Sequence, residues 1–277
     1  MPCRFPVGPC LADATAIPYD RRRNMPCPGR RPQAGTPRRT ARVPTRNIGR
    51  KLRDLGRWLR TPISRRRAMR RVAEFHSRQR PLDEVVQWAM AFGTRGRFRV
   101  KTIQIASEIT ALAREVDKIS PQTILEIGTS EGGTALIWAQ LASQRVITCD
   151  ITPPGPRGAL LTAFPPPMSK CRVTLLTGDS HSREFARRLE RELNGAAVDF
   201  LFIDGDHSEG GVEADYELYR PFVRSGGIIA FHDIAERQDQ PGNEVQHFWK
   251  RLKDRGPVEE FIQDRNQVGF GIGLVRV

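Results

Sequence analysis

The sequence predicts an α/β protein built on a doubly wound, mostly parallel sheet, and two observations support this prediction. From about residue 120, short runs of branched apolar residues alternate with segments of helical periodicity, which is typical of parallel strands joined by helices. The last two strand-like runs, near 258–262 and 269–277, have no helix between them. Two strands without a crossover can pair only as an antiparallel hairpin, so we expect the sheet to end in one.

Charge divides the chain into two parts. Residues 1–80 contain 22 Lys and Arg against 4 Asp and Glu, whereas residues 81–277 contain 23 against 27. The net charge of +14 therefore belongs to the N-terminal part and does not indicate that the following domain binds nucleic acid. Residues 1 to about 48 are rich in Pro and Arg without apolar periodicity, which predicts disorder. We expect a basic Pro/Arg-rich arm over 1–80 and one folded domain over 81–277.

Residues 49–80 contain leucines and a tryptophan at helical spacing among arginines, which predicts a basic helix within the arm. Several interpretations stay open: a solvated, partly helical arm, a helix that contacts anionic lipid, nucleic acid or the domain, and a transit peptide. Translation from Met25 or Met69 would remove part of the arm. No apolar run approaches the ~20 residues of a transmembrane helix. The five cysteines show no Cys-x-x-Cys spacing, and reduced thiols in a cytoplasmic protein are the expected state.

The elements expected in the domain follow one another in a regular order. Two helices come first, over 82–92 and about 105–119, joined by a Gly- and Arg-rich link at 93–99 that would cover a ligand if these helices form a lid. The expected parallel strands are 123–126, 145–148, 173–176, 198–203 and 227–231, and the expected helices among them are 132–143, 182–193, 212–223 and 243–255.

Each of the five expected parallel strands ends in an acidic residue. In an open parallel sheet, ligands bind at the carboxyl ends of the strands, near the point where the strand order reverses. Five carboxylates along one edge would repel one another without a cationic or donor-rich ligand, so the set predicts a binding site. Its members are Glu126, Asp150, Asp179, Asp204 and Asp233.

The turn after the first strand, Gly128-Thr-Ser-Glu-Gly-Gly133, is poorly suited to phosphate. A dinucleotide fingerprint would place a glycine where Ser130 stands, and Glu131 faces the expected position of the phosphates. An NAD-dependent oxidoreductase is therefore the less favoured alternative.

The acids suit a cationic ligand instead. Asp150 lies 22 residues after Gly128, where a carboxylate can accept both hydroxyls of a ribose. Glu126 can favour an ammonium group, directly or through water, and Asp179 lies where an adenine amine would fall. Together these residues predict a cationic ligand that contains ribose, adenine and an amino acid.

Four motifs carry a resemblance to a known family: LEIGTSEGGT at 125–134, LFIDGDHS at 201–208, GGIIAFHD at 226–233 and GFGIG at 269–273. With them, the domain resembles a class I S-adenosylmethionine-dependent methyltransferase. It is most similar to the cephalosporin hydroxylase-like branch and more distantly to the catechol and caffeoyl-CoA O-methyltransferases. The resemblance implies a seven-stranded Rossmann-like sheet with an antiparallel last strand, and S-adenosyl-L-methionine as the methyl donor. The residues expected to bind this cofactor are Glu126, Gly128, Thr129, Ser130, Gly132, Asp150, Asp179, Ser180 and Asp204.

The chemistry of the acceptor suggests roles for the later strand ends. A hydroxyl acceptor must lose its proton to a base, or bind a divalent metal that lowers its pKa. In related metal-dependent O-methyltransferases, the metal carboxylates match Asp204 and Asp233. The third ligand position is His232, where an acid or amide is commoner, and imidazole suits softer metals than Mg²⁺. In the metal-free alternative, His207 or His232 is the base, so His207, His232 and Asp233 are the expected catalytic residues.

We therefore expect an O-methyltransferase that uses S-adenosyl-L-methionine, and either no metal or Mg²⁺ or Mn²⁺, on a hydroxyl of a small-molecule or sugar-containing metabolite. A non-enzymatic nucleotide-ligand-binding protein, whose basic arm contacts nucleic acid or anionic lipid, is a further alternative. The loops at 152–170 and 234–243, which would contact the acceptor, carry no recognisable specificity motif. A homo-oligomer is compatible with the sequence, which does not predict the oligomeric state.

Overall fold

A seven-stranded sheet forms the centre of the protein in a computed structural model that describes residues 46–277, with side chains described from residue 61 onward. Residues 1–45, where disorder was expected, lie outside the described residues. The strands are β1 (Thr123–Ile127), β2 (Arg145–Asp150), β3 (Arg172–Thr177), β4 (Val198–Ile203), β5 (Val223–His232), β6 (Val258–Phe261) and β7 (Ile272–Arg276).

The strand order is β3-β2-β1-β4-β5-β7-β6. Strands β1 to β5 are parallel, while β7 runs antiparallel to both β5 and β6. This arrangement confirms the predicted fold class, including the terminal hairpin. The chain leaves β1 toward β2 on one side and returns to β4 on the other, so the strand order reverses at β1. The carboxyl ends of β1 and β4 are therefore where a ligand is expected in such a sheet.

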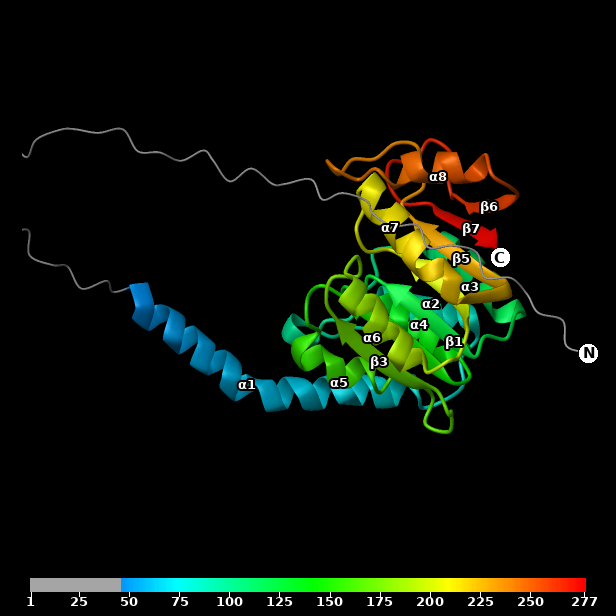
Figure 1. Ribbon diagram of the computed structural model, residues 1–277. Helices are drawn as coiled ribbons and strands as arrows, with labels where there is room; N and C mark the ends of the chain where they lie inside the picture. The colour runs from blue at the N-terminus through cyan, green and yellow to red at the C-terminus, as the bar shows by residue number, and fades with distance from the viewer. Residues whose placement is uncertain (1–45) are drawn as a thin grey trace, which may run out of the picture. The chain divides into compact units, whose positions relative to one another are not determined.

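Helices cover both faces of the sheet (Figure 1). Because side chains alternate between the two faces of a strand, Ile124 and Phe200 pack toward α2, α3 and α4, whereas Leu125 and Leu201 pack toward α6, α7 and α8. The α-helices are α1 (Arg46–Phe75), α2 (Leu82–Met90), α3 (Ala106–Lys118), α4 (Gly133–Leu141), α5 (Gly158–Leu161), α6 (Arg183–Leu193), α7 (Glu209–Tyr219) and α8 (Val245–Lys253). Three short 3-10 helices lie at Gly96–Phe98, Gly155–Arg157 and Arg220–Phe222.

Two strands begin three or more residues away from the positions expected. β5 starts at Val223 rather than residue 227, because an irregularity in its pairing with β4 lets the strand extend backward. The last strand starts at Ile272 rather than residue 269, because residues 269 to 271 all have positive φ angles of 76°, 62° and 83°. Such angles are incompatible with a strand. They place Phe270 in a loop beside the end of β5.

The C-terminal part of α1 belongs to the hydrophobic core. Ala68, Val72 and Phe75 are buried and pack with α2, and Phe75 makes an edge-on contact with Trp88 at a centroid distance of 5.4 Å. Apolar packing thus begins upstream of residue 81, where the boundary of the domain was expected. None of the described helices is long and apolar enough to span a membrane.

Candidate functional site

Two adjoining cavities at the carboxyl ends of the parallel strands share several lining residues. The first, of about 500 Å³, lies beyond β1, β2, β3 and β4, and we call it the β2–β3 cavity. The second, of about 180 Å³, lies beyond β1, β4 and β5 and beneath the loops at 101–104 and 238–243, and we call it the β5 cavity. Both cavities are lined by Gly128, Ser130, Asp204 and His207. The two cavities therefore meet where the strand order reverses.

In the turn after β1, the backbone at Gly128 lies very close to the backbone at the end of β4. Gly128 has φ +104°, and a Cβ atom there would lie 1.9 Å from the carbonyl oxygen of Asp204. The backbone N–H groups of Gly128 and Thr129 both donate to the carbonyl oxygen of Cys149, at 2.8 and 2.9 Å. The turn is thus fixed between the ends of β2 and β4. Only glycine fits at position 128.

Asp150 holds the backbone of Ser130, the residue that stands where a dinucleotide site has glycine. Ser130 adopts φ 46°, a left-handed conformation that is unusual for a residue with a side chain. Its N–H donates to Asp150 Oδ2 at 2.8 Å, while Asp150 Oδ1 accepts the N–H of Thr152 at 2.7 Å. Asp150 lines the β2–β3 cavity and holds the turn in its conformation at the same time.

The other residues of the turn anchor the start of α4. Gly132 caps the helix with φ +75°, and Gly133 lies so close to Thr102 that a Cβ atom would be 2.3 Å from its backbone nitrogen. Gly132 therefore supports the turn but does not line either cavity. Glu131 is engaged by Arg99 of the preceding link, whose Nε donates to both carboxylate oxygens at 2.9 and 2.7 Å. The link thus lies against the turn.

The side chain of Glu126 points away from both cavities. Alternation along β1 turns its side chain toward α4, where Oε1 accepts the indole N–H of Trp138 at 2.8 Å and Oε2 accepts the hydroxyl of Thr148 at 2.5 Å. The carboxyl is fully buried and lines neither cavity. Burial raises its pKa from the usual 4.5 to about 7, against the effect of these hydrogen bonds. A direct contact with a ligand's ammonium group does not fit this position.

Three further residues expected to bind a cofactor lie around the two cavities. Asp179 and Ser180 follow β3 and line the β2–β3 cavity. Asp179 is exposed and accepts the N–H of His181 at 3.0 Å, while the carbonyl oxygen of Ser180 accepts the hydroxyl of Tyr219. Thr129 lines the β5 cavity, where its hydroxyl lies 2.6 Å from that of Thr148.

Two carboxylates and two imidazoles meet at the ends of β4 and β5. His232 Nδ1 lies 3.2 Å from both Asp204 Oδ1 and Asp233 Oδ1. His207 bridges the same two acids, with Nε2 at 3.4 Å from Asp204 Oδ1 and Nδ1 at 3.3 Å from Asp233 Oδ2. The structure therefore brings together all four residues for which metal binding or catalysis was expected. His207 is partly exposed, whereas His232 is buried.

The four groups shift one another's pKa values. Burial raises the pKa of Asp204, but the charge of His232 and hydrogen bonds from both imidazoles outweigh it and lower the value to about 2. The hydrogen bond with Asp204 raises the pKa of His207. Burial lowers the pKa of His232, yet the carboxylates beside it dominate and raise the value to about 8. The cluster thus favours charged acids beside protonated imidazoles.

Two amides that the sequence analysis did not assign orient the acids. Gln104 Nε2 donates to Asp204 Oδ2 at 3.0 Å, and Asn243 Nδ2 donates to Asp233 Oδ2 at 2.6 Å. Asp233 has φ 63°, and its Oδ1 accepts the N–H of Phe270 at 3.1 Å. Asn243 follows an irregular loop without periodicity, so no signal in the sequence singles it out. Gln104 follows the link and belongs to none of the four motifs.

Three residues of the same cluster are close enough together to bind one metal ion. Asp204, His232 and Asp233 each offer one ligand atom, and these atoms lie within 4.8 Å of one another. Two carboxylates and one imidazole suit a divalent transition metal better than Mg²⁺, which prefers oxygen ligands. The imidazole–carboxylate contacts described above also form a closed network without an ion. Both interpretations of the cluster fit its geometry.

Comparisons with known proteins agree with this architecture. Residues 125–234 match a protein family described as a methyltransferase domain, which confirms the resemblance seen in the motifs. An O-methyltransferase from Bacillus cereus, solved in complex with SAH, is similar in structure with a TM-score of 0.50 and 19% identity over 71% of this chain and 90% of that chain. The O-methyltransferase TomG from Streptomyces achromogenes, solved with SAM, gives a TM-score of 0.49 and 18% identity over 74% and 94%. At these identities the first likeness shows the fold alone, and the second carries no further weight.

One curated relative matches a short part of the chain. The uncharacterized protein R132 of Acanthamoeba polyphaga mimivirus is 43% identical over 44 residues, which are 16% of this chain. The matched part spans only 20% of that relative's length.

Proposed function

Because residues 125–234 match a protein family described as a methyltransferase domain, we propose that the protein transfers a methyl group from S-adenosyl-L-methionine to a hydroxyl oxygen of a small molecule. One observation carries the proposal: the β2–β3 and β5 cavities meet at Gly128, Ser130, Asp204 and His207. Methyl transfer is an in-line displacement, so donor and acceptor must be held side by side and aligned. Two adjoining cavities at the reversal of strand order provide such a place.

The β2–β3 cavity suits the donor. Its volume of about 500 Å³ lies in the range of small-ligand sites. Asp150 and Asp204 on its walls favour a positively charged ligand, and the bare backbone at Gly128 leaves room for one. Asp150 makes one hydrogen bond through each carboxylate oxygen, so each keeps a lone pair for a ribose hydroxyl. When bound, the donor supplies an electrophilic methyl group on a sulfonium.

His207 is the base that the arrangement favours. It lies at the junction of the cavities, is more accessible than His232, and has carboxylates at both ring nitrogens. In the proposed reaction, the unprotonated ring accepts the proton of the acceptor hydroxyl as the oxygen forms its new bond to the methyl carbon. Asp204 and Asp233 then stabilise the imidazolium that results. In the neutral ring, one nitrogen keeps its proton and donates it to the carboxylate beside it, while the other nitrogen accepts the proton of the hydroxyl.

A divalent metal is the alternative means of deprotonation. Asp204, His232 and Asp233 would hold it, and the ion would lower the pKa of the acceptor hydroxyl. Binding of Mn²⁺ to the purified protein, followed by electron paramagnetic resonance, tests this alternative without reference to turnover. If the metal centre exists, His232→Ala weakens Mn²⁺ binding and His247→Ala, a change at an exposed histidine of α8, does not. Equal binding by both variants contradicts it.

The donor is tested by calorimetric titration with S-adenosylmethionine and S-adenosylhomocysteine. Saturable binding of both is expected, and binding of neither overturns the proposed function. The acceptor class is tested with a panel of free sugars and phenols, each scored for S-adenosylhomocysteine formed. On any acceptor that turns over, His207→Ala is expected to lower kcat at least ~100-fold while donor affinity is retained. His247→Ala serves as the matched control.

The partners and location of the protein stay predictions from its sequence. These include a cytoplasmic location, a homo-oligomer, and contact of the basic arm with anionic lipid or nucleic acid. The arm's role is best tested by deleting residues 1–60, because a deletion to residue 80 would also remove Ala68, Val72 and Phe75 from the core. Binding to anionic vesicles or duplex DNA that falls steeply with salt and is lost on this deletion supports a role for the arm. Unchanged binding argues against it.

A further inference from the structure

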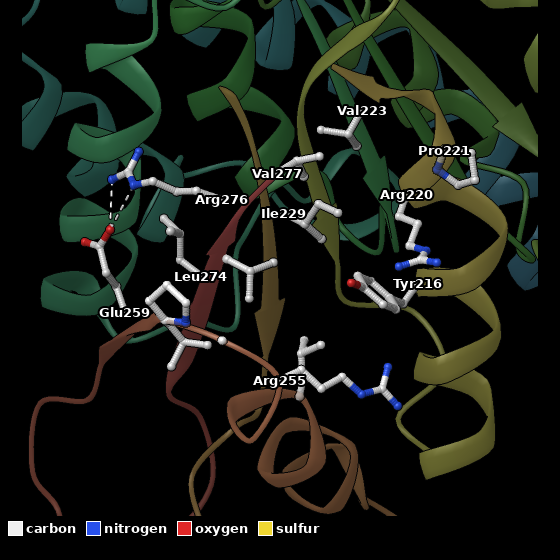
Figure 2. A pocket seen from close by; sticks show the side chains of 15 residues that line it. Tyr216, Arg220, Pro221, Val223, Ile229, Arg255, Glu259, Leu274, Arg276 and Val277 are labelled. Carbon is white, nitrogen blue, oxygen red and sulfur yellow. Dashed lines mark hydrogen bonds and ion pairs between the residues drawn. The ribbon is translucent and has the colours of Figure 1, made fainter. Parts of the chain in front are cut away.

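A further cavity lies away from the strand-end site. It has a volume of about 930 Å³ and lies between the end of α7 and the end of α8, over β5 and β7 (Figure 2). We call it the α7–α8 groove. It shares no lining residue with the β2–β3 or β5 cavity. Val223 at the start of β5 lines it, whereas the proposed active site lies at the other end of that strand.

The floor of the groove is apolar. Figure 2 shows the side chains of Ile229 on β5 and Leu274 on β7 at its centre, with Val223 beyond them. These three side chains are buried, and the partly exposed Val258 of β6 continues the apolar surface. Pockets that bind small molecules are typically concave and mostly apolar, with volumes of about 300–1,000 Å³. The volume of the α7–α8 groove lies in this range.

Positive charge lies on one side of this floor. Arg220 lies with its guanidinium 5.4 Å from the ring centre of Tyr216 and makes one ion pair, from Nε to Glu217 at 3.2 Å. Arg255 extends from the end of α8 toward the same α7 side (Figure 2). Within residues 61–277, its side chain makes no hydrogen bond or ion pair. The α7 side of the groove therefore offers guanidinium groups with free donors.

The opposite side is neutralised. Arg276 pairs with Glu259 at 2.9 Å and with Glu115 at 2.8 Å, and Figure 2 shows the first of these pairs pointing away from Arg255. The α7 side of the groove therefore carries more unneutralised positive charge than the opposite side. A ligand with a negative group at one end and an apolar body would match it, with the negative group beside Arg220 and Arg255.

The charge also argues against two other occupants. Residues 1–45 contain nine arginines and two aspartates, so this segment would be repelled by Arg220 and Arg255. A second copy packed through the same surface about a two-fold axis would bring the arginines of both copies together. An isolated anionic ligand meets neither penalty.

We propose that the α7–α8 groove binds a small amphipathic carboxylate, whose carboxylate pairs with Arg255 and Arg220 and whose apolar body lies over Ile229 and Leu274. Arginine is suited to this role because its planar guanidinium can hold both oxygens of a carboxylate. The site is independent of the proposed methyl transfer, since it needs neither the donor nor the residues of the strand-end cavities.

The test uses the fluorescent carboxylate 11-(dansylamino)undecanoate on the full-length protein, and the titration is done with and without S-adenosylhomocysteine, which should not change it. Saturable binding with one probe per chain is expected. Arg255→Glu is expected to weaken it at least tenfold, and Arg220→Glu similarly. Arg187→Glu, an equal charge change on the exposed surface of α6, should leave the dissociation constant within twofold. Circular dichroism checks that the variants keep the fold.

Three outcomes would overturn the proposal. The first is an equal dissociation constant for the wild-type protein and Arg255→Glu. The second is displacement of the probe by methyl dodecanoate as readily as by dodecanoate, which would mean that the carboxylate is not recognised. The third is a dimer in analytical ultracentrifugation that Arg255→Glu dissociates, which would assign the groove to a second copy of the chain instead.

Discussion

At the scale of single residues, Glu126 has a structural role that its residue type and its position in the sequence do not indicate. Glu126 lies near the end of β1, where a ligand-binding acid was expected, yet it is buried against Trp138 and Thr148. Burial raises its pKa to about 7, so near neutral pH the folded protein holds a proton there that the unfolded chain releases. The residue is therefore a pH-dependent element of stability beneath the turn, and its carboxyl lines neither cavity.

A stability measurement tests this role of Glu126. The group binds its proton more tightly when folded, so its contribution to the free energy of unfolding is fully present below pH ~4.5 and is lost as the pH rises through about 7. The loss amounts to about 3 kcal/mol in order of magnitude. Glu126→Gln is expected to remove this part of the pH dependence in urea unfolding at pH 5, 6 and 7. The same slope in wild type and variant would contradict the assignment.

Asp150 combines a structural contact with a proposed contact to the donor. Asp150→Asn can keep only one of the two backbone hydrogen bonds from Ser130 and Thr152, because one carboxylate oxygen becomes an NH₂ group. We expect the dissociation constant for S-adenosylhomocysteine to rise about tenfold or more, as one charge-assisted hydrogen bond is lost. Asp117→Asn is the matched comparison, since Asp117 is exposed on α3 and lines neither cavity. An equal effect of both changes would speak against a special role for Asp150.

At the scale of elements, α7 supports the loop after β3. Asp215 and Tyr219 are four residues apart and so lie on one side of the helix. The hydroxyl of Tyr219 donates to the carbonyl oxygen of Ser180, and Asp215 Oδ1 lies 3.4 Å from His181 Nε2. Ser180 and His181 both line the β2–β3 cavity. The helix therefore positions part of the proposed donor site without contacting the donor.

Because α7 holds the loop after β3, a change at Tyr219 should weaken donor binding without changing kcat. Tyr219→Phe removes the hydrogen bond to Ser180 and keeps the ring in the core, so the loop is expected to lose its fixed position. The dissociation constant for S-adenosylhomocysteine should rise about threefold to tenfold, as expected for loss of ~1 kcal/mol of hydrogen-bond energy. At saturating donor, kcat should not change. A fall in kcat with unchanged donor affinity would contradict a positioning role.

The loop between β6 and β7 is held in place by α3. Glu108 in α3 lines neither cavity. Its buried carboxylate accepts the N–H groups of Gln263 and Gly271, both at 3.0 Å. Glu108 thus fixes the loop that carries Phe270, whose N–H in turn holds Asp233 at 3.1 Å. The GFGIG motif contributes to the site through this chain of contacts.

At the scale of the whole molecule, α1 determines where the folded domain begins. Phe75→Ala is expected to lower the free energy of unfolding by about 3–5 kcal/mol, because it would leave a cavity beside Trp88 and Phe92. Arg66→Ala, at an exposed position of the same helix, should change it by less than ~0.5 kcal/mol. Urea unfolding of both variants measures the difference. Equal stability would exclude α1 from the core.

The sequence by itself determined the order of the elements, the terminal hairpin and the row of acids at the strand ends. These features follow from local periodicity and from the rule that parallel strands share one carboxyl edge. It did not predict the direction of Glu126, which depends on which face of β1 meets Trp138. Nor did it assign Gln104 or Asn243. Gln104 lies 100 residues from Asp204, and only the tertiary fold brings such distant partners within hydrogen-bond distance.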